Sequence, residues 1–192
     1  MKPIDFLEFL NKTQHLKSIL RHSWTDDIER QESVAEHSWH MAVMAIALSP
    51  YLKNKIDLFR VLKLISIHDI GESITGDIPA FNGKHNGKYE SERKAVEEII
   101  KSLPSERKEE ILRLWEEYEQ KKTRESIFVK MLDVLDVLFQ HLVADITTWA
   151  EKETTFNLNR NSEEYFKEEP FMLELYDLIH TKLDKKVKEF KG

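Results

Sequence analysis

Histidine and aspartate side chains interrupt three otherwise apolar stretches of this sequence. His37 lies near the start of one stretch, His68 and Asp69 end the next, and Asp133 and Asp136 lie within a third. An ionised carboxylate that is buried without a partner is strongly disfavoured, so each of these groups needs a compensating charge. Two imidazoles and two carboxylates can satisfy one another by binding one divalent cation. The pattern therefore predicts a metal site, with Asp133 and Asp136 as alternative ligands.

The chemistry of such a site follows from its donor atoms. Taken singly, each residue is more simply explained as a hydrogen-bonded polar group of the core, and only the combination favours a shared ion. Two nitrogen and two oxygen ligands suit Mn, Fe, Co, Ni or Zn better than Ca. An ion that accepts further ligands keeps positions open for water and substrate, as metal catalysis requires. We therefore expect one catalytic divalent transition metal ion of unspecified identity.

The composition excludes several other kinds of site and partner. The 192 residues include no cysteine, which rules out disulfides, thiolate zinc sites and thiol nucleophiles. A net charge of −6 does not fit a long nucleic-acid surface, although one or two cations could still bind a single phosphate. No apolar run approaches a membrane span, and the first residues lack the apolar core of a signal peptide. We expect a cytoplasmic protein that binds neither nucleic-acid polymers nor membranes.

The spacing of apolar residues predicts an all-α protein that forms one compact bundle of about seven to eight helices. Ser33 and Glu36 form a capping box that opens the helix carrying His37, and Pro50 ends it. Asp57 can cap the next helix, which ends near Gly71. Further helices are expected at the N-terminus behind Pro3, at about 90–103, 105–121 and 124–150, and near the C-terminus from about Phe171.

Three polar segments should connect these helices. Loops are expected from roughly Lys17 to Gln31, between Gly71 and Lys88, and from 151 to 169. The helix that follows Ser33 is apolar on most sides and should therefore lie at the centre of the fold. Residues 1–192 are interpreted as a single domain, with a motif-bearing core over about 15–140 and a C-terminal helical extension over about 141–192.

The order His37, His68-Asp69, Asp133 resembles the H…HD…D pattern of the HD-domain metal-dependent phosphohydrolases. Five longer segments over about residues 15–140 are similar to the 5′-deoxynucleotidase branch of that superfamily. They are Glu32-Ser33-Val34-Ala35-Glu36-His37-Ser38, His68-Asp69-Ile70-Gly71-Glu72, Gly76-Asp77-Ile78-Pro79, Leu114-Trp115-Glu116-Glu117-Tyr118 and Phe128-Val129-Lys130-Met131-Leu132-Asp133. The resemblance implies a homodimeric HD-domain phosphomonoesterase that hydrolyses 2′-deoxynucleoside 5′-monophosphates to deoxynucleoside and phosphate.

The same resemblance implies a particular ligand set. His37, His68, Asp69 and Asp133 occupy the family's metal-ligand positions, so Asp133 is expected to bind the ion in preference to Asp136. Two other readings of the function remain open. The site could act on a nucleoside triphosphate, a cyclic nucleotide or another small phosphate ester, or the chain could be a non-catalytic module that binds a nucleotide or a metal.

Two acidic residues are candidates for proton transfer. Glu72 follows Asp69 by three residues and His68 by four, so one more helical turn would place it beside the ligands, where it could orient or deprotonate a water molecule. Asp77 matches a family position, which suggests contact with substrate or protonation of the leaving 5′-oxygen. Without the resemblance, an aspartate after Gly76 is equally well explained as a turn former.

Arg21 and Trp24 resemble the R-x-x-W element of the family. A guanidinium can bind two phosphate oxygens, and an indole can pack on a sugar or a base. Their types alone would place Trp24 in the core and Arg21 at the surface. His40 is interpreted as a packing residue or one that supports the ligands, and Lys130 and Asp136 receive no role. The remaining histidines considered, which are His15, His85, His141 and His180, are interpreted as structural.

Overall fold

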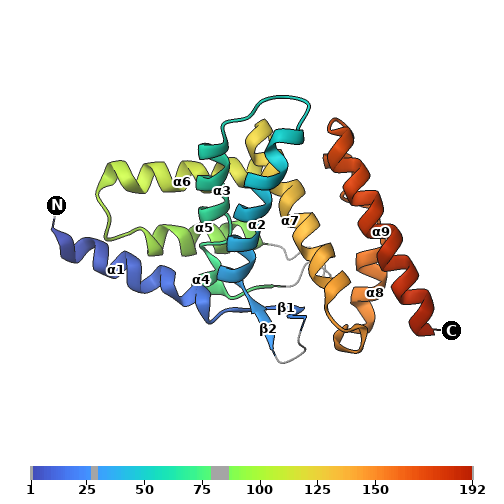
Figure 1. Ribbon diagram of the computed structural model, residues 1–192. Helices are drawn as coiled ribbons and strands as arrows, with labels where there is room; N and C mark the ends of the chain where they lie inside the picture. Colours follow the sequence, from blue (N-terminus) through green and yellow to red (C-terminus); the bar gives the residue numbers. More distant parts are fainter. Residues whose placement is uncertain (1, 27–29, 79–86, 192) are drawn as a thin grey trace.

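Helices dominate the computed structural model, which describes residues 2–26, 30–78 and 87–191 (Figure 1). The described ranges contain the helices α1 (Pro3–Thr13), α2 (Val34–Leu48), α3 (Leu58–Ile67), α4 (Glu72–Thr75), α5 (Lys88–Ile99), α6 (Ser105–Gln120), α7 (Arg124–Val143), α8 (Glu151–Leu158) and α9 (Pro170–Lys191). All except α4 have at least eight residues, so the expected all-α fold class is confirmed. Within the same ranges, no helix is both long and apolar enough to cross a membrane.

The capping box predicted from the sequence begins α2. The backbone N–H of Glu36 donates to Ser33 Oγ at 3.2 Å, and the Glu36 carboxylate accepts from the Ser33 N–H at 2.9 Å. A hydrogen bond from Arg30, reinforced by those from Ser33, lowers the pKa of Glu36 to about 2. This start places His37 in the first turns of α2, with its side chain fully buried.

A second predicted cap begins α3. The Asp57 side chain accepts a hydrogen bond from the backbone N–H of Arg60 at 3.1 Å. The helix ends at Ile67, so His68 and Asp69 occupy the two positions that follow it. The metal-ligand candidates of the second apolar stretch therefore lie where the chain turns from α3 towards α4.

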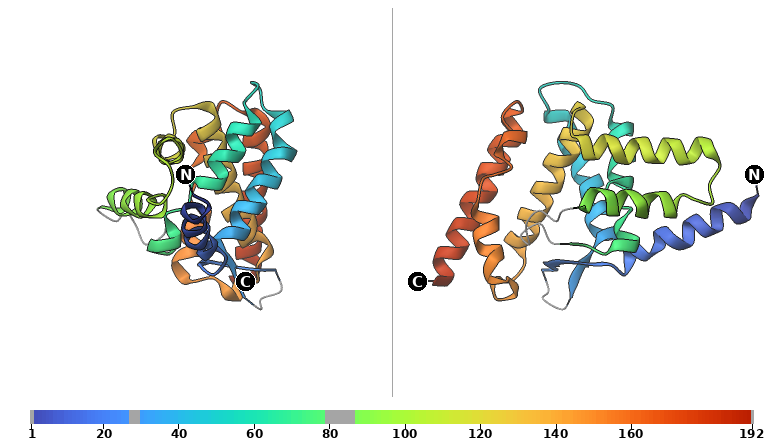
Figure 2. Two further views of the ribbon diagram at one scale, coloured as in Figure 1. Left: turned by 90° about the vertical axis from the view of Figure 1, so that its left-hand side faces the viewer. Right: turned by 180° about the vertical axis from the view of Figure 1, so that it is seen from behind.

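The main hydrophobic core lies between α2, α3, α6, α7 and the C-terminal segment. Its largest fully buried side chains include Met41, Leu64, Phe128, Leu132, Phe166 and Tyr176. A smaller core links the start of α4 to α5 and α6, around Ile70, Val96, Ile99 and Trp115. In Figures 1 and 2, α1, α5 and α6 project to one side of the central helices, whereas α8 and α9 cover the other side.

Hydrogen bonds from Lys186 connect the C-terminal helix α9 to the end of α7. The Lys186 ammonium donates hydrogen bonds to the backbone oxygens of His141 at 3.1 Å and Leu142 at 2.8 Å, and also to that of Ala144. These carbonyls lie at the C-terminal end of α7, where helical partners are lacking and a positive charge is favourable.

The prediction of a loop from roughly Lys17 to Gln31 is wrong in part. Leu20–Trp24 forms strand β1, which pairs antiparallel with β2 (Gln31–Ser33) through Leu20 with Ser33 and Trp24 with Gln31. The register shifts between these two pairs. A strand this short is stabilised by its pairing partner and by packing, which its own residue pattern does not reveal.

The helix boundaries near the C-terminus also differ from the prediction. The helix expected over 124–150 ends at Val143, and the interval 151–169 expected as a loop contains α8. The side chains that α8 buries are polar, Glu153 and Asn157, and they lie one turn apart. Because an apolar stripe is absent from this helix, hydrophobic periodicity could not indicate it.

Part of the interval between Gly71 and Lys88 is helical, because it contains α4. Pro79 and His85 lie outside the described residues.

The sequence predicts that α2, which is apolar on most sides, lies at the centre of the fold, and one face of it is buried there. Val34, His37, Met41 and Ala45 face the core, but the opposite face exposes large apolar side chains. Trp39 is 66% exposed, and Val43 and Ile46 are exposed beside it along the helix. The helix is therefore central in the fold but presents an apolar outer surface.

Candidate metal centre

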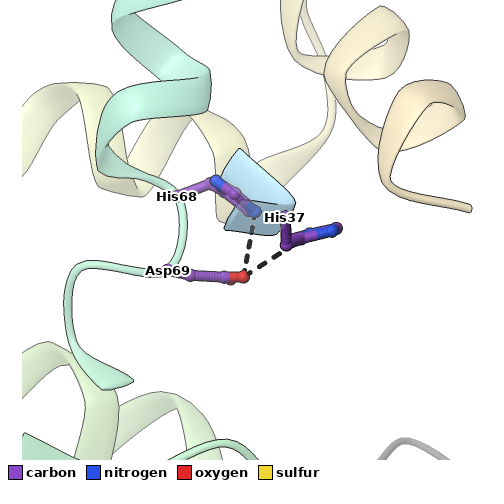
Figure 3. A group of neighbouring side chains, drawn as sticks. All are labelled: His37, His68 and Asp69. Carbon is purple, nitrogen blue, oxygen red and sulfur yellow. Dashed lines mark ion pairs between the residues drawn. The ribbon is translucent and has the colours of Figure 1, made fainter. Parts of the chain in front are cut away.

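His37, His68 and Asp69 meet where α2 begins and α3 ends (Figure 3). Asp69 Oδ2 lies 3.0 Å from His68 Nε2 and 3.8 Å from His37 Nε2. One ligand atom from each side chain lies within 4.8 Å of the others, a spacing that can hold a metal ion. His37 is fully buried and His68 is 3% exposed, so both imidazoles are held in a solvent-poor environment.

Asp133 on α7 completes the set of four expected ligands. Its Oδ1 lies 3.4 Å from His37 Nε2. Its other oxygen, Oδ2, accepts hydrogen bonds from Lys130 Nζ at 2.8 Å and from the Tyr118 hydroxyl at 3.1 Å. Burial would raise the pKa of Asp133, but Lys130 and His37 together hold it well below its usual value. The carboxylate is therefore ionised, with Oδ1 on the side of the other ligands.

The hydrogen bonds of the imidazoles decide which nitrogen could bind an ion. His68 Nδ1 lies 2.7 Å from the backbone oxygen of Ile65, which can only accept, so this nitrogen carries the proton. His37 Nδ1 lies 2.5 Å from Asp136 Oδ2. Among the described residues, both Nε2 atoms are buried and make no hydrogen bond of good geometry, and their nearest polar neighbours are the carboxylate oxygens of Asp69 and Asp133. Metal-binding histidines typically show this arrangement, with Nδ1–H held by an oxygen and Nε2 directed at the ion.

The electrostatics of the centre also favour a bound cation. Burial and the neighbouring Arg21 would lower the pKa of His37, but the carboxylates of Asp133 and Asp136 raise it to about 10. The site therefore attracts positive charge strongly, and a proton and a metal ion compete for His37 Nε2. The residues present thus fit a divalent metal ion.

A cavity of about 1100 Å³ lies beside the expected ligands, and His68, Asp69 and Asp133 help to line it. Arg21 reaches this cavity from β1, with Nη1 3.5 Å from Asp69 Oδ2 and Nε 3.6 Å from Glu32 Oε2. Burial would lower the pKa of Arg21, but the surrounding carboxylates raise it, so the guanidinium stays charged. It lies where it could contact an anion bound beside the metal ligands.

Glu72 and Asp77 also line this cavity. The backbone N–H of Glu72 donates to the Asp69 carbonyl at 3.0 Å, which is the helical turn expected from the sequence. Burial, together with the charges of Asp69 and Asp77, raises the pKa of Glu72 to about 10. Burial also raises the pKa of Asp77, although Arg21 opposes that shift. Both carboxyl groups therefore have a high affinity for protons in a cavity that could hold a phosphate ester.

Trp24 has a different environment from Arg21. Its backbone oxygen accepts a hydrogen bond from Gln140 Nε2 at 2.5 Å, and the residue is half-buried. Of the two residues in the R-x-x-W element, only Arg21 is among the described residues that line the cavity.

Comparisons with known proteins agree with this geometry. A sequence model of the HD domain matches residues 13–172. This chain belongs to the HD-domain family. The chain is 38% identical to the 5′-deoxynucleotidase HDDC2 of Homo sapiens over 136 residues, which are 70% of this chain and 65% of the human protein. The 5′-deoxynucleotidase HDDC2 of Dictyostelium discoideum is 34% identical over 71% of this chain and 75% of its own length. This chain thus spans about two thirds of the human relative.

A solved structure supports the HD-domain architecture over nearly the whole chain. It is described as a predicted metal-dependent phosphohydrolase from Magnetospirillum magnetotacticum MS-1 and is 30% identical in sequence. The TM-score is 0.83, and the match covers 96% of this chain and 92% of that one. The similarity therefore extends through the C-terminal helices, which the motifs in the sequence do not reach.

Several residues that surround the ligands of the HD-domain site receive no settled role from the sequence, whereas His40 is interpreted as a packing residue or one that supports the ligands. Asp136 accepts hydrogen bonds from Nδ1 of both His37 and His40, so both it and His40 support a ligand. Tyr118 and Lys130 instead donate to Asp133. Lys130 lies three residues before Asp133 on α7, so this contact could be anticipated from the sequence. The contacts of Asp136 with His37 and His40 depend on the packing of α2 against α7, and that of Tyr118 with Asp133 depends on the packing of α6 against α7.

A second acidic group of the HD domain also includes His37. Glu32, His37 and Asp136 have ligand atoms within 4.8 Å of one another and are all buried. Glu32 accepts a hydrogen bond from Ser23 Oγ at 3.2 Å, and burial, followed by the charge of Asp136, raises its pKa. The hydrogen bond from His37 Nδ1 already satisfies Asp136 on this side. Nε2 on the opposite edge of the ring therefore remains the atom that can bind a metal.

Proposed function

We propose that this HD-domain protein is a metal-dependent phosphomonoesterase that hydrolyses 2′-deoxynucleoside 5′-monophosphates to deoxynucleoside and phosphate. The observation that carries this proposal is the meeting of His37, His68, Asp69 and Asp133 at a cavity that also receives the charged Arg21. The activity named for the relatives supports the choice of substrate.

His37 and His68 through Nε2, with carboxylate oxygens of Asp69 and Asp133, would hold one divalent ion. When bound, such an ion supplies a Lewis acid for a phosphoryl oxygen and makes a bound water molecule more acidic. Mn, Co, Ni, Fe and Zn all accept this mixed nitrogen and oxygen donor set.

The other cavity residues have complementary roles in the proposed reaction. Arg21 binds non-bridging phosphate oxygens, for which its fork of N–H donors is suited. Glu72 takes a proton from the attacking water in its carboxylate form, which the positive charge of a bound ion would favour against the raised pKa of the metal-free site. Asp77, whose pKa is also raised, gives a proton to the leaving 5′-oxygen. Contact of Trp24 with the sugar or base would require a movement of its indole, because Trp24 is not among the described residues that line the cavity.

The test is phosphate release from a panel of deoxy- and ribonucleoside monophosphates, each assayed with Mn, Fe, Co, Ni, Zn or Mg. Nucleoside triphosphates and cyclic nucleotides belong in the same panel, because they represent the alternative substrates. Hydrolysis restricted to the deoxynucleoside monophosphates supports the proposal. A preference for another nucleotide class would replace the substrate, and lack of turnover with every metal would favour a non-catalytic binding module.

A matched pair of variants tests the metal assignment. Asp69→Ala should lose both bound metal and activity, because it removes a ligand that lies near both imidazoles. Asp184→Ala makes the same change at a partly exposed carboxylate that pairs with Lys188 on α9, and it should retain both properties. An Asp69→Ala protein that is active and free of metal would refute the assignment.

We further propose that the protein is a homodimer. The outer face of α2 exposes the apolar side chains of Trp39, Val43 and Ile46, and the neighbouring helix α7 exposes those of Phe139 and Val143. The His40 ring connects the two groups, since its centroid is 6.2 Å from that of Trp39 and 5.9 Å from that of Phe139. Contiguous apolar surface of this kind is typical of an interface. Sedimentation of the wild-type protein and of Trp39→Glu would test this.

The other expectations from the sequence are also retained as proposals. We propose one domain over residues 1–192, because Lys186 on α9 is bonded to the end of α7. A cytoplasmic location, and no binding to membranes or nucleic-acid polymers, are expected of this acidic chain. Cell fractionation and binding assays with vesicles and DNA would test these expectations.

A further inference from the structure

The cavity continues from the metal centre along one face of α7. Asp133, Val134, Val137, Leu138 and His141 all line it, at the spacing of a single helical face. His141 follows Asp133 by eight positions, which corresponds to about 12 Å along the helix axis. This length matches an extended nucleoside monophosphate that has its phosphate at the metal centre.

The chemistry of this wall changes along its length. Charged side chains surround Asp133, the middle is apolar because it consists of Val134, Val137 and Leu138, and the far end is polar again around His141. A deoxynucleoside monophosphate has the same order, with an anionic phosphate, a deoxyribose that lacks one hydroxyl group, and a base with polar edges. The wall thus matches the proposed substrate in the order of its charged, apolar and polar regions as well as in length.

At the far end, α8 contributes two buried polar residues, Glu153 and Asn157, which are 2% and 1% exposed. Both oxygens of the Glu153 carboxylate already have polar partners. Oε1 lies 3.1 Å from His141 Nε2 and 3.3 Å from His22 Nε2, and Oε2 accepts from the Ala150 N–H at 2.5 Å. Asn157 Nδ2, in contrast, is buried without a hydrogen-bond partner among the described residues, although Asn157 lines the cavity. A buried amide donor without a partner is unfavourable and indicates that a ligand supplies the acceptor.

We propose that this far end binds the base of the substrate and that Asn157 donates a hydrogen bond from Nδ2 to an oxygen or ring nitrogen on the base edge. Tyr165, which is half-buried, and His180 line the same cavity and supply aromatic surface against which a flat base can pack. The inference rests on the proposed function, because the deoxynucleotidase reaction is what brings a nucleotide to the metal centre.

The opposite end of the cavity is less suited to a base. The helices α5 and α6 line it with charged side chains, among them Lys88, Glu92 and Glu119. Lys88 Nζ pairs with Glu92 Oε1 at 3.4 Å, so this region already contains an ion pair. A neutral base placed there would displace water from these charges without replacing its hydrogen bonds.

The first experiment measures binding of deoxynucleosides to the metal-free protein by calorimetry, so it does not depend on turnover. Asn157→Asp has the same shape but turns oxygen acceptors towards the base, and it should weaken binding at least tenfold. Asn161→Asp is the matched control, because Asn161 is exposed and follows the same helix. It should leave binding unchanged. Equal affinities for both variants and the wild type would overturn the proposal, as would failure of the wild type to bind any deoxynucleoside.

The second experiment compares a deoxynucleoside monophosphate with 2-deoxyribose 5-phosphate, which has no base, in the metal-loaded enzyme. The wild type should show at least tenfold higher kcat/KM for the nucleotide, and Asn157→Asp should reduce that ratio at least tenfold through KM. This comparison of substrates needs no variant, so it stands even if Asn157→Asp fails to fold. An unchanged preference in the variant, or no preference in the wild type, would refute the role of the far end. Lack of phosphate release from both substrates would instead refute the proposed function, and deoxynucleoside binding would still report on Asn157.

Discussion

The substitution Asp136→Asn tests whether the hydrogen bonds behind His37 prepare the metal centre. Asp136 is fully buried, and its two oxygens accept from Nδ1 of His37 and of His40. Hydrogen bonds to His37 and His40 lower its pKa although burial opposes this, so the group is a carboxylate. It keeps the proton of His37 on Nδ1 and thereby leaves Nε2 available to a metal ion.

Asparagine has nearly the same shape but only one accepting oxygen. When its amide nitrogen faces His37, Nδ1 must act as the acceptor and the proton must move to Nε2, where it blocks metal binding. When it faces His40 instead, His37 keeps a weaker, uncharged partner. Loss of such a supporting group reduces metal affinity about 10- to 100-fold, which is roughly 1.4–2.7 kcal/mol.

The assay is competition for Mn, Co or Zn against a chromophoric chelator, with thermal unfolding measured in parallel. His40→Ala is the control, because it removes the other partner of Asp136 and leaves the bond to His37 intact. We expect the metal affinity of that variant to change by less than about threefold, well below the effect of losing a supporting group. A folded Asp136→Asn protein that binds metal as tightly as wild type would show that Asp136 does not prepare His37.

Three further changes should have distinct effects. Arg21→Ala should raise KM for the nucleotide about 10-fold or more, because charge-assisted bonds to phosphate are lost, while the chelator assay still shows bound metal; an unchanged KM would contradict this. Glu36→Gln should lower the free energy of unfolding by about 1 kcal/mol at pH 7. Since the pKa of Glu36 is lowered from 4.5 to about 2 in the folded state, this stability is present above pH 4.5. The gap in Tm between the variant and wild type should close as the pH falls towards 2, and a gap independent of pH would exclude the charge of Glu36. Lys186→Met should destabilise the protein by about 1–3 kcal/mol in denaturant unfolding, whereas the same change at the exposed Lys185 should have little effect.

The parts of the fold that depend on local sequence could be predicted. Ser33, Glu36 and Asp57 cap α2 and α3 because each bonds to a backbone group three residues away, within the same segment. The meeting of His37 with His68 could also be expected, because polar groups that interrupt apolar helices must find partners in the core. Their ligation of a metal remains a prediction.

The remaining features depend on contacts between distant segments. Strand β1 owes its existence to pairing with β2, and α8 buries Glu153 and Asn157 instead of an apolar stripe. The choice between Asp133 and Asp136 was also beyond periodicity, because the two lie one turn apart on the same helix. In the structure they differ in which edge of the His37 ring they contact, and only the packing of α2 on α7 sets that difference.

The short strand β1 contacts both ends of the cavity through two adjacent residues. Arg21 pairs with Asp69 at the metal centre, and the next residue, His22, pairs with Glu153 at the far end. A single peptide unit joins these contacts, so a shift of the strand that changes one must disturb the other. We expect ion binding and nucleoside binding to be thermodynamically linked through β1. Such linkage is reciprocal: if the metal tightens nucleoside binding by some factor, the nucleoside tightens metal binding by the same factor.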